Sequence, residues 1–201
     1  MAEGLVQENV DVEWERIKPL QHLRFPIGSV LKTFWMMLLT FFRKRYPIEP
    51  LDEKCFSDYD LIILAGPTWS YNPSGPVLAL CDRDGKRLFT GRRVLPLISC
   101  RGYWRMHWWG LRKILHKYKA SVDNLIVFSH PSREPWRTIG VFLKLAGRIP
   151  ERMWFSRFYR KYGHTTAQRL EAERFGIMIG KALVEGTDLG QLNFKSKKAL
   201  V

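Results

Sequence analysis

Three short apolar runs, each separated from the next by a helical stretch, constrain the fold of this chain more than any other feature. They lie at 59–65, 93–99 and 124–128. Runs of this length without polar interruption are typical of strands buried on both faces of a parallel sheet. Strands that alternate with helices form βαβ units, in which helices cover both faces of the sheet. The sequence therefore predicts an α/β fold, a three-layer sandwich with a parallel sheet.

Two helices are predicted strongly by their apolar spacing and end signals. Over 104–118 the apolar residues recur every three or four positions, and Arg and Lys fill the other side. The last helix is expected to start at Thr165, because Gln168 follows at capping-box spacing. Its end is expected near Gly186. Both stretches should cover the sheet.

Other segments carry weaker patterns. The stretch 29–45 predicts a helix with an unusually apolar middle, interpreted as a buried helix covering the sheet, with an interfacial membrane helix as the alternative. Residues 10–17 alternate apolar and charged, which predicts a strand with one wet face. We expect a single domain over 1–188 and a flexible tail over 189–201.

The charge balance indicates the kind of partner. The chain has 33 Lys and Arg against 19 Asp and Glu, a formal net charge of +14. Such a surface favours anionic partners, so the basic stretch 83–119 is either a solvated face or a docking surface for an anionic membrane or an acidic protein. Nucleic acid is not indicated, because no helix-turn-helix, zinc-finger or RNP signature is present.

Cysteine and histidine spacing excludes the common metal and redox motifs. Cys55, Cys81 and Cys100 are far apart, and no pair has C-x-x-C spacing. Sparse, unpaired cysteines are typical of a reducing compartment, so we expect a cytoplasmic protein, with a peripheral membrane location as the alternative. No apolar run reaches the roughly 18 residues of a membrane span, and the acidic N-terminal stretch does not resemble a signal peptide.

Two aromatic loops follow the first two predicted strands. The first contains Pro67, Thr68, Trp69, Ser70, Tyr71 and Asn72, and the second contains Ser99, Cys100, Arg101, Gly102, Tyr103 and Trp104. Ligands of parallel sheets bind at the carboxyl ends of the strands, so these loops and the one after Phe128 form the candidate site. Hydroxyl and amide groups can bond the edges of a planar ligand, and aromatic rings can stack on its faces. Cys100 beside Arg101 is either a stabilised thiolate or an inert cysteine.

These residues also carry a family resemblance. The stretch 58–76 (DYDLIILAGPTWSYNPSGP) resembles the third strand and first flavin loop of flavodoxin-like proteins, and the chain from Gly91 onward resembles the fourth strand and second flavin loop. Residues 9–19 match the second strand. Within that group the segments VDVEWERIKP, ISCRGYW and VDNLIVF most resemble a subset labelled dialkylresorcinol condensing enzyme.

The resemblance implies FMN as cofactor and redox chemistry as function. The twelve loop residues named above would flank the flavin, which would transfer electrons or hydride. No metal is expected, the catalytic residues and the redox partner are unknown, and a homodimer is one of the open oligomeric states. The alternative is a flavin-free binding module that uses its basic surface to dock on an anionic membrane or an acidic partner.

One departure from the family pattern concerns the N-terminus. Residues 1–6 resemble the end of the family's first helix, so the first strand and the FMN phosphate loop are missing from this sequence. Three explanations are open: the sequence is truncated at its N-terminus, the second strand pairs directly with the third, or a partner chain supplies the missing strand. Without the phosphate loop we expect FMN to bind weakly or not at all.

Overall fold

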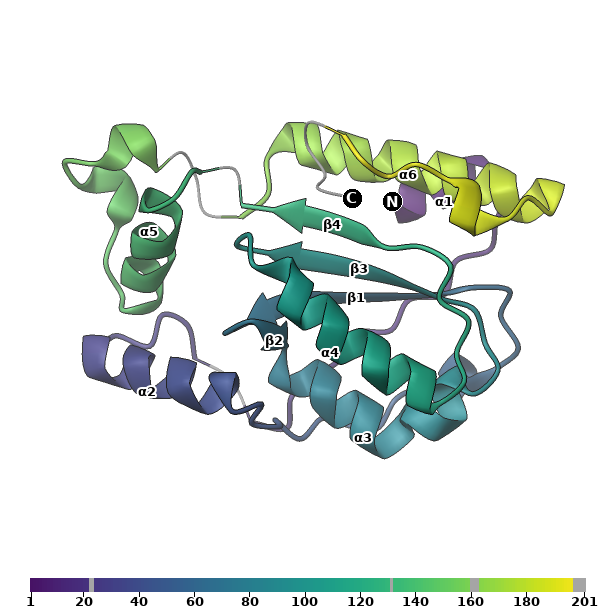
Figure 1. Cartoon of the computed structure of the whole chain (residues 1–201), viewed down its shortest axis with the longest axis horizontal. Coiled ribbons are helices and arrows are strands. Elements are labelled where there is room, and N and C mark those ends of the chain that lie inside the picture. The colour runs from purple at the N-terminus through teal and green to yellow at the C-terminus, as the bar shows by residue number, and fades with distance from the viewer. Residues whose placement is uncertain (22–23, 131, 160–162, 197–201) are drawn as a thin grey trace.

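The computed structural model of the chain describes residues 1–21, 24–130, 132–159 and 163–196, and its centre is a four-stranded sheet (Figure 1). The strands are β1 (Ile62–Trp69), β2 (Asn72–Pro73), β3 (Val94–Cys100) and β4 (Ile126–Ser129). Their order is β2-β1-β3-β4. The strands β1, β3 and β4 are parallel, and β2 is a short antiparallel partner of β1. The predicted parallel sheet is confirmed.

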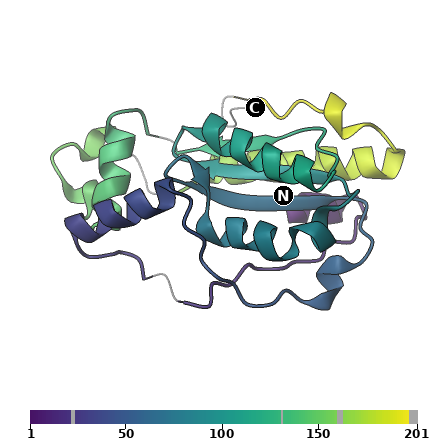
Figure 2. The same ribbon diagram turned by 60° about the horizontal axis from the view of Figure 1, so that its bottom comes forward.

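Helices cover both faces of this sheet, as Figures 1 and 2 show. The helices are α1 (Ala2–Gln7), α2 (Val30–Phe41), α3 (Gly75–Phe89), α4 (Trp104–Lys117), α5 (Trp136–Leu145) and α6 (Thr166–Glu185). Four 3-10 turns accompany them: η1 (Glu53–Phe56), η2 (Pro150–Arg152), η3 (Ser156–Phe158) and η4 (Leu189–Gln191). Leu111 and Leu115 of α4 pack with α3 on one face, and Phe175 and Ile179 of α6 pack with α1 on the other. The α/β sandwich predicted from the sequence is therefore confirmed.

The two strongly predicted helices form as expected. Helix α4 occupies nearly the whole of 104–118. Helix α6 has the complete capping box between Thr165 and Gln168, and Gly186 ends it with a left-handed φ of 68°. Gly176 lets α1 approach closely, because a Cβ there would collide with the carbonyl group of Met1. Local signals set the ends of α6, and glycines on both helices, including Gly4 and Gly176, allow α1 to pack closely on it.

The predicted strand at 10–17 is wrong. In the described part of the chain this segment forms no strand and adds nothing to the sheet. It therefore does not pair with β1, as it would if the family's second strand paired directly with the third. Val10 and Val12 pack against the core on the α6 side, whereas Ile17 packs against the core on the α3 side. The alternating pattern is thus satisfied by packing alone. Ala65 of β1 is exposed, so the expectation that this strand is buried on both faces is also incorrect.

Helix α2 does not cover the sheet, contrary to the favoured interpretation of 29–45. It lies beside α5 beyond the carboxyl ends of the strands, at one end of the molecule (Figures 1 and 2). The backbone N–H of Ile27 donates to the carbonyl oxygen of Leu145 at 2.7 Å, which ties the entry of α2 to the end of α5.

The expected flexible tail is also corrected in part. Leu189 begins η4, and Leu189 and Phe194 are buried against α6. Phe194 contacts Phe175 edge to face, with ring centroids 5.1 Å apart. The segment 189–194 is therefore anchored to the core by Leu189, Leu192 and Phe194. Residues 197–201 lie outside the described residues.

The described ranges contain neither a membrane-spanning helix nor a cluster of metal ligands. None of their helices combines the length and the apolar character needed to cross a bilayer. Among the same residues, no group of three or more His, Cys, Asp or Glu is arranged to hold a metal ion.

Candidate functional site

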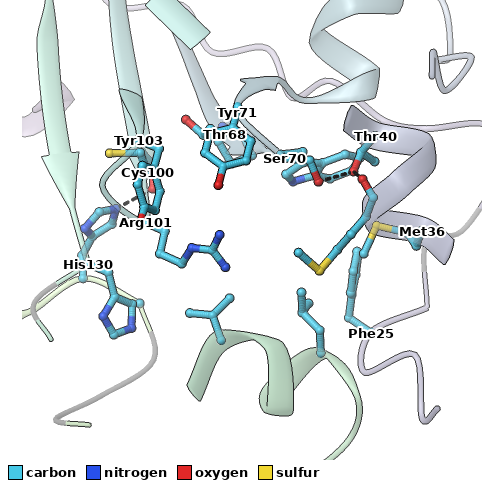
Figure 3. A pocket seen from close by; sticks show the side chains of 18 residues that line it. Phe25, Met36, Thr40, Thr68, Ser70, Tyr71, Cys100, Arg101, Tyr103 and His130 are labelled. Carbon is cyan, nitrogen blue, oxygen red and sulfur yellow. Dashed lines mark hydrogen bonds between the residues drawn. The ribbon is translucent and has the colours of Figure 1, made fainter. Parts of the chain in front are cut away.

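A cavity of about 410 Å³ lies where the carboxyl ends of β1 and β3 face the α2–α5 pair (Figure 3). Its volume falls in the range of small-molecule sites, roughly 300 to 1,000 Å³. It is lined by Phe25, Met36, Met37, Thr40, Pro67, Thr68, Trp69, Ser70, Tyr71, Ser99, Cys100, Arg101, Tyr103, His130, Val141, Leu145, Gly163 and His164. The cavity thus combines residues from loops, helices and strand ends that are far apart in sequence.

Most of the residues chosen from the sequence meet in this cavity. Nine of the twelve line it: Pro67, Thr68, Trp69, Ser70, Tyr71, Ser99, Cys100, Arg101 and Tyr103. Parallel pairing explains the meeting, since Pro67 lies opposite Ser99 in the β1–β3 register. The carboxyl ends of these adjacent strands place both loops at one edge of the sheet.

The other three, Asn72, Gly102 and Trp104, do not line the cavity. The Asn72 side-chain amide donates to the carbonyl oxygens of Phe41 at 2.9 Å and Ser70 at 3.1 Å. Asn72 therefore joins α2 to the β1–β2 turn. Trp104 packs against the buried cluster that contains Ile98.

Gly102 has a backbone rather than a ligand-facing role. Its φ is 148°, and the guanidinium group of Arg137 lies where a Cβ would stand. The absence of a side chain at Gly102 therefore makes room for α5 to pack against the second loop. Glycine is favoured at this position because both the conformation and the space exclude a Cβ.

The aromatic rings of the two loops meet each other rather than leaving an open slot. The Tyr71 and Tyr103 rings are 5.2 Å apart between centroids and tilted by 63°. Trp69 instead packs edge to face against Phe25 and Tyr46. The loops do lie side by side, but the expected sandwich for a flat ring is closed between the tyrosines.

The turn that presents Tyr71 has an unusual backbone. Ser70 and Tyr71 join β1 to β2 in a two-residue hairpin, and their φ angles are 42° and 71°. Turns with two positive φ angles usually carry Asn or Gly, because a Cβ is disfavoured there. The Ser70 hydroxyl is 2.7 Å from that of Thr40, which ties the turn to α2. Strained turns of this kind are concentrated at ligand sites.

A buried histidine of α4 contacts the first loop. The Thr68 hydroxyl is 2.7 Å from Nδ1 of His107, which is 2% exposed. Burial lowers the pKa of His107 to about 3, so the ring is neutral near pH 7. His107 is therefore packed on the buried side of α4, where it fixes the Thr68 side chain.

A second histidine orients the second loop. Nε2 of His164 is 2.8 Å from the Ser99 hydroxyl, and its Nδ1 is 3.3 Å from Oε1 of Gln168. The Gln168 amide is held in place because its Nε2 donates to the Ser129 carbonyl oxygen at 2.7 Å. Oε1 therefore accepts from Nδ1 of His164, and Nε2 of His164 accepts from Ser99. In this arrangement Nε2 of His164 is the hydrogen-bond acceptor that holds the Ser99 hydroxyl in place.

Polar donors gather at the same side of the cavity. Nδ1 of His130 accepts from the backbone N–H of Ser132, which places the ring proton on Nε2. Nε2 of His130 and Nε of Arg101 are buried and have no partner among the described residues. Burial, and after it the cation Arg137, lowers the pKa of His130 to about 4. Figure 3 shows the Arg101 guanidinium extending into the cavity. This side suits an anionic or strongly accepting group.

The opposite side of the cavity is apolar. The apolar lining comes from Met36 and Met37 of α2, from Val141 and Leu145 of α5, and from Phe25. A ligand that fits both sides therefore has a polar or anionic part and an apolar part. This division was not visible in the two loops alone.

Cys100 does not provide a nucleophile at neutral pH. Its side chain is buried, and burial raises the pKa of its thiol to about 11. Arg101 does not offset this effect. Of the two alternatives for Cys100, the structure supports the inert one.

Several lining residues escaped the sequence analysis. His130 follows the third predicted strand, so the rule about strand ends pointed to its loop but not to the residue. His164 stands just before the capping box of α6, a position with no ligand signal of its own. Met36 and Val141 belong to helices whose position beyond the sheet is set by tertiary packing. The residues missed are thus mainly those outside the β1 and β3 loops.

Comparison with known proteins gives one fold-level likeness. No family model and no curated protein matches the chain. Among solved structures the chain is similar to a flavoprotein from Lactobacillus acidophilus NCFM that was crystallised in complex with FMN. The two are 19% identical, the match covers 63% of this chain and 81% of that chain, and the TM-score is 0.46. A likeness of this size does not bear on what the present chain binds.

Proposed function

We propose that this chain is a flavodoxin-like protein that holds the ring of FMN in the cavity between its first two strand-end loops. The observation that carries the proposal is the shared cavity itself. Loops separated by about thirty residues, after β1 and after β3, meet there with aromatic, hydroxyl and cationic side chains. This is the edge of a parallel sheet at which nucleotide-type ligands bind.

The lining residues fit the ring better than they fit the phosphate. Tyr71, Tyr103 and Trp69 supply aromatic surface, and a cavity of about 410 Å³ is large enough for a tricyclic ring. Among the described residues, Arg101 is the Arg or Lys that lines the cavity, so it would meet the phosphate or another anionic group. Because one cation replaces a full phosphate loop, we expect weaker binding than that of a complete site.

When bound, FMN supplies one-electron or hydride transfer. The side chains of this protein would position the ring and form hydrogen bonds at its edge. Tyr103 would contact its face once it separates from Tyr71. Nε2 of His164 would keep the Ser99 hydroxyl oriented, and Nε2 of neutral His130 would donate a hydrogen bond. Cys100 would remain a thiol and serve as packing.

Titration of the full chain with FMN and with riboflavin tests the proposal. Flavin fluorescence and the visible bands should change with both ligands, because both contain the ring. Arg101→Gln should weaken FMN binding about tenfold or more, the value of one charge-assisted hydrogen bond, and leave riboflavin unchanged. Tyr103→Ala should weaken both ligands.

Trp14→Ala is the matched control, because Trp14 is 73% exposed and does not line the cavity. It should bind both flavins as the unaltered protein does. If neither flavin perturbs the spectrum at micromolar protein, the chain is not a flavin protein. If Arg101→Gln weakens riboflavin as much as FMN, Arg101 does not contact the phosphate.

A further inference from the structure

Helix α2 presents its apolar side to solvent. Its exposed large apolar residues are Val30, Leu31, Phe34, Trp35 and Phe41, and the adjoining Phe42 is exposed too. Leu31 is 76% exposed and Phe42 is 72% exposed. Positions 31, 34, 35, 41 and 42 follow helical spacing, so they form one stripe along the helix. In a helix of a globular protein such a stripe normally faces the core.

The buried side of α2 is instead partly polar. Thr33 and Thr40 are almost fully buried. The Thr33 hydroxyl donates to the carbonyl oxygen of Ser29 at 2.7 Å, and that of Thr40 bonds with Ser70. These contacts fix the helix with its apolar stripe outward. The exposure of the stripe is therefore a property of how α2 is held.

The neighbouring segment adds further exposed apolar groups at the same end of the molecule. Ile139, Ile149, Trp154 and Phe158 are exposed, and Trp154 reaches 79%. These residues come from α5 and from the turns that follow it, beside α2 in Figures 1 and 2. We call residues 24–45 and 133–158 together the α2–α5 end. A monomeric soluble protein rarely leaves so much apolar surface in one region.

This end is also strongly basic. Residues 24–45 contain five Lys and Arg and no acid, and 133–158 contain six Lys and Arg and two acids. The two segments together therefore carry nine more cationic than acidic side chains. Both acids are already paired, Glu134 with Arg137 at 3.1 Å and Glu151 with Lys144 at 3.2 Å.

We propose that the α2–α5 end docks on the surface of an anionic lipid membrane. Exposed Trp, Phe and Leu side chains insert at the headgroup level, and Lys and Arg around them meet the lipid phosphates. The twelve-residue α2 is about 18 Å long, too short to span the roughly 30 Å hydrocarbon core, so it lies in the interface. Docking of a second copy is disfavoured because like charge would face like charge.

Sedimentation of the full chain with lipid vesicles tests this proposal. Vesicles of phosphatidylcholine with about a third phosphatidylglycerol should bind the protein at low salt, and pure phosphatidylcholine should bind it much less. Binding should weaken as salt rises. Arg148→Gln with Arg152→Gln should reduce binding about 25-fold, since each cation near an anionic surface is worth about fivefold. Both residues are exposed.

Apolar insertion is tested separately. Leu31→Ser with Trp35→Ser should reduce binding about tenfold or more, because both side chains are lost from the interface. The matched control is Leu170→Ser with Val184→Ser, which removes two exposed apolar groups from α6. For the cations it is Arg169→Gln with Lys181→Gln, also on α6. Circular dichroism checks that each variant folds.

Two outcomes would overturn the proposal. One is no binding to anionic vesicles at low salt. The other is a loss of binding that is the same in the α6 controls as in the α2–α5 variants. If light scattering instead shows a dimer that Leu31→Ser with Trp35→Ser dissociates, a second copy covers the stripe and the membrane is not its partner. None of these results depends on flavin binding.

Discussion

Mild acid should destabilise this protein through two buried histidines. Burial lowers the pKa of His107 to about 3, and burial together with nearby Arg137 lowers that of His130 to about 4. In the unfolded chain both pKa values return to about 6.5. Between 6.5 and the folded values the unfolded state binds protons that the folded state does not. Stability is therefore complete above pH 6.5 and falls as the pH drops.

The size of the effect follows from the distance below the unfolded pKa. At pH 5, about 1.5 units below 6.5, each histidine costs about 2 kcal/mol of unfolding free energy. His107 and His130 together should cost about 4 kcal/mol between pH 7 and pH 5. The result is insensitive to the folded pKa, since both values lie well below 5.

Urea unfolding at pH 7 and pH 5 measures this loss. His107→Gln keeps a hydrogen-bonding group near Thr68 but cannot titrate, so its loss should be about 2 kcal/mol instead of about 4. His116→Gln is the control, because His116 is exposed on α4 and the same substitution should leave the full loss in place. A wild-type loss below about 1 kcal/mol, or an equal loss in His107→Gln, would refute the reasoning.

Three further substitutions or modifications have defined outcomes. Gly176→Ala should lower the free energy of unfolding by about 1–3 kcal/mol or more, because the new methyl group meets the backbone of Met1 at the start of α1. Gly180→Ala should lower it less, because its methyl group meets the side chain of Glu8. The melting temperatures of the two variants measure this difference. Asn72→Ala should cost about 1–3 kcal/mol, measured by urea unfolding, because the carbonyl groups of α2 and the turn lose their donor. Iodoacetamide should label Cys55 before Cys100 in the native protein, as mass spectrometry can show, because Cys100 is buried and Cys55 is not; equal rates would contradict this.

Much of the fold was predictable because its signals are local. The apolar spacing of 104–118 and the capping box at Thr165 each depend on neighbours within one or two helical turns, and α4 and α6 formed as expected. The rule about strand ends is nearly as local, because it needs only the direction of each strand. The rule correctly predicted that the loops after β1 and β3 lie together, although it uses no information on side-chain packing.

Other predictions failed because the pattern had more than one physical solution. Alternation over 10–17 can be satisfied in a sheet or, as here, by an extended segment whose residues pack on two separate cores. The apolar content of 29–45 shows that a helix forms, but not which side it buries. Buried Thr33 and Thr40 decide that side, and their partners include Ser70, thirty residues further on.

The amino-acid sequence alone determined the alternating strands and helices, the basic charge and the chemical character of the two loops, since each depends on residue type and short spacing. Tertiary structure decided the rest. It placed the Tyr71 ring against the Tyr103 ring and turned the apolar stripe of α2 outward. It also buried His107 and His130, which lowers the pKa values of both. Each of these depends on which distant segments meet, because burial and contact are properties of the assembled chain rather than of any one stretch.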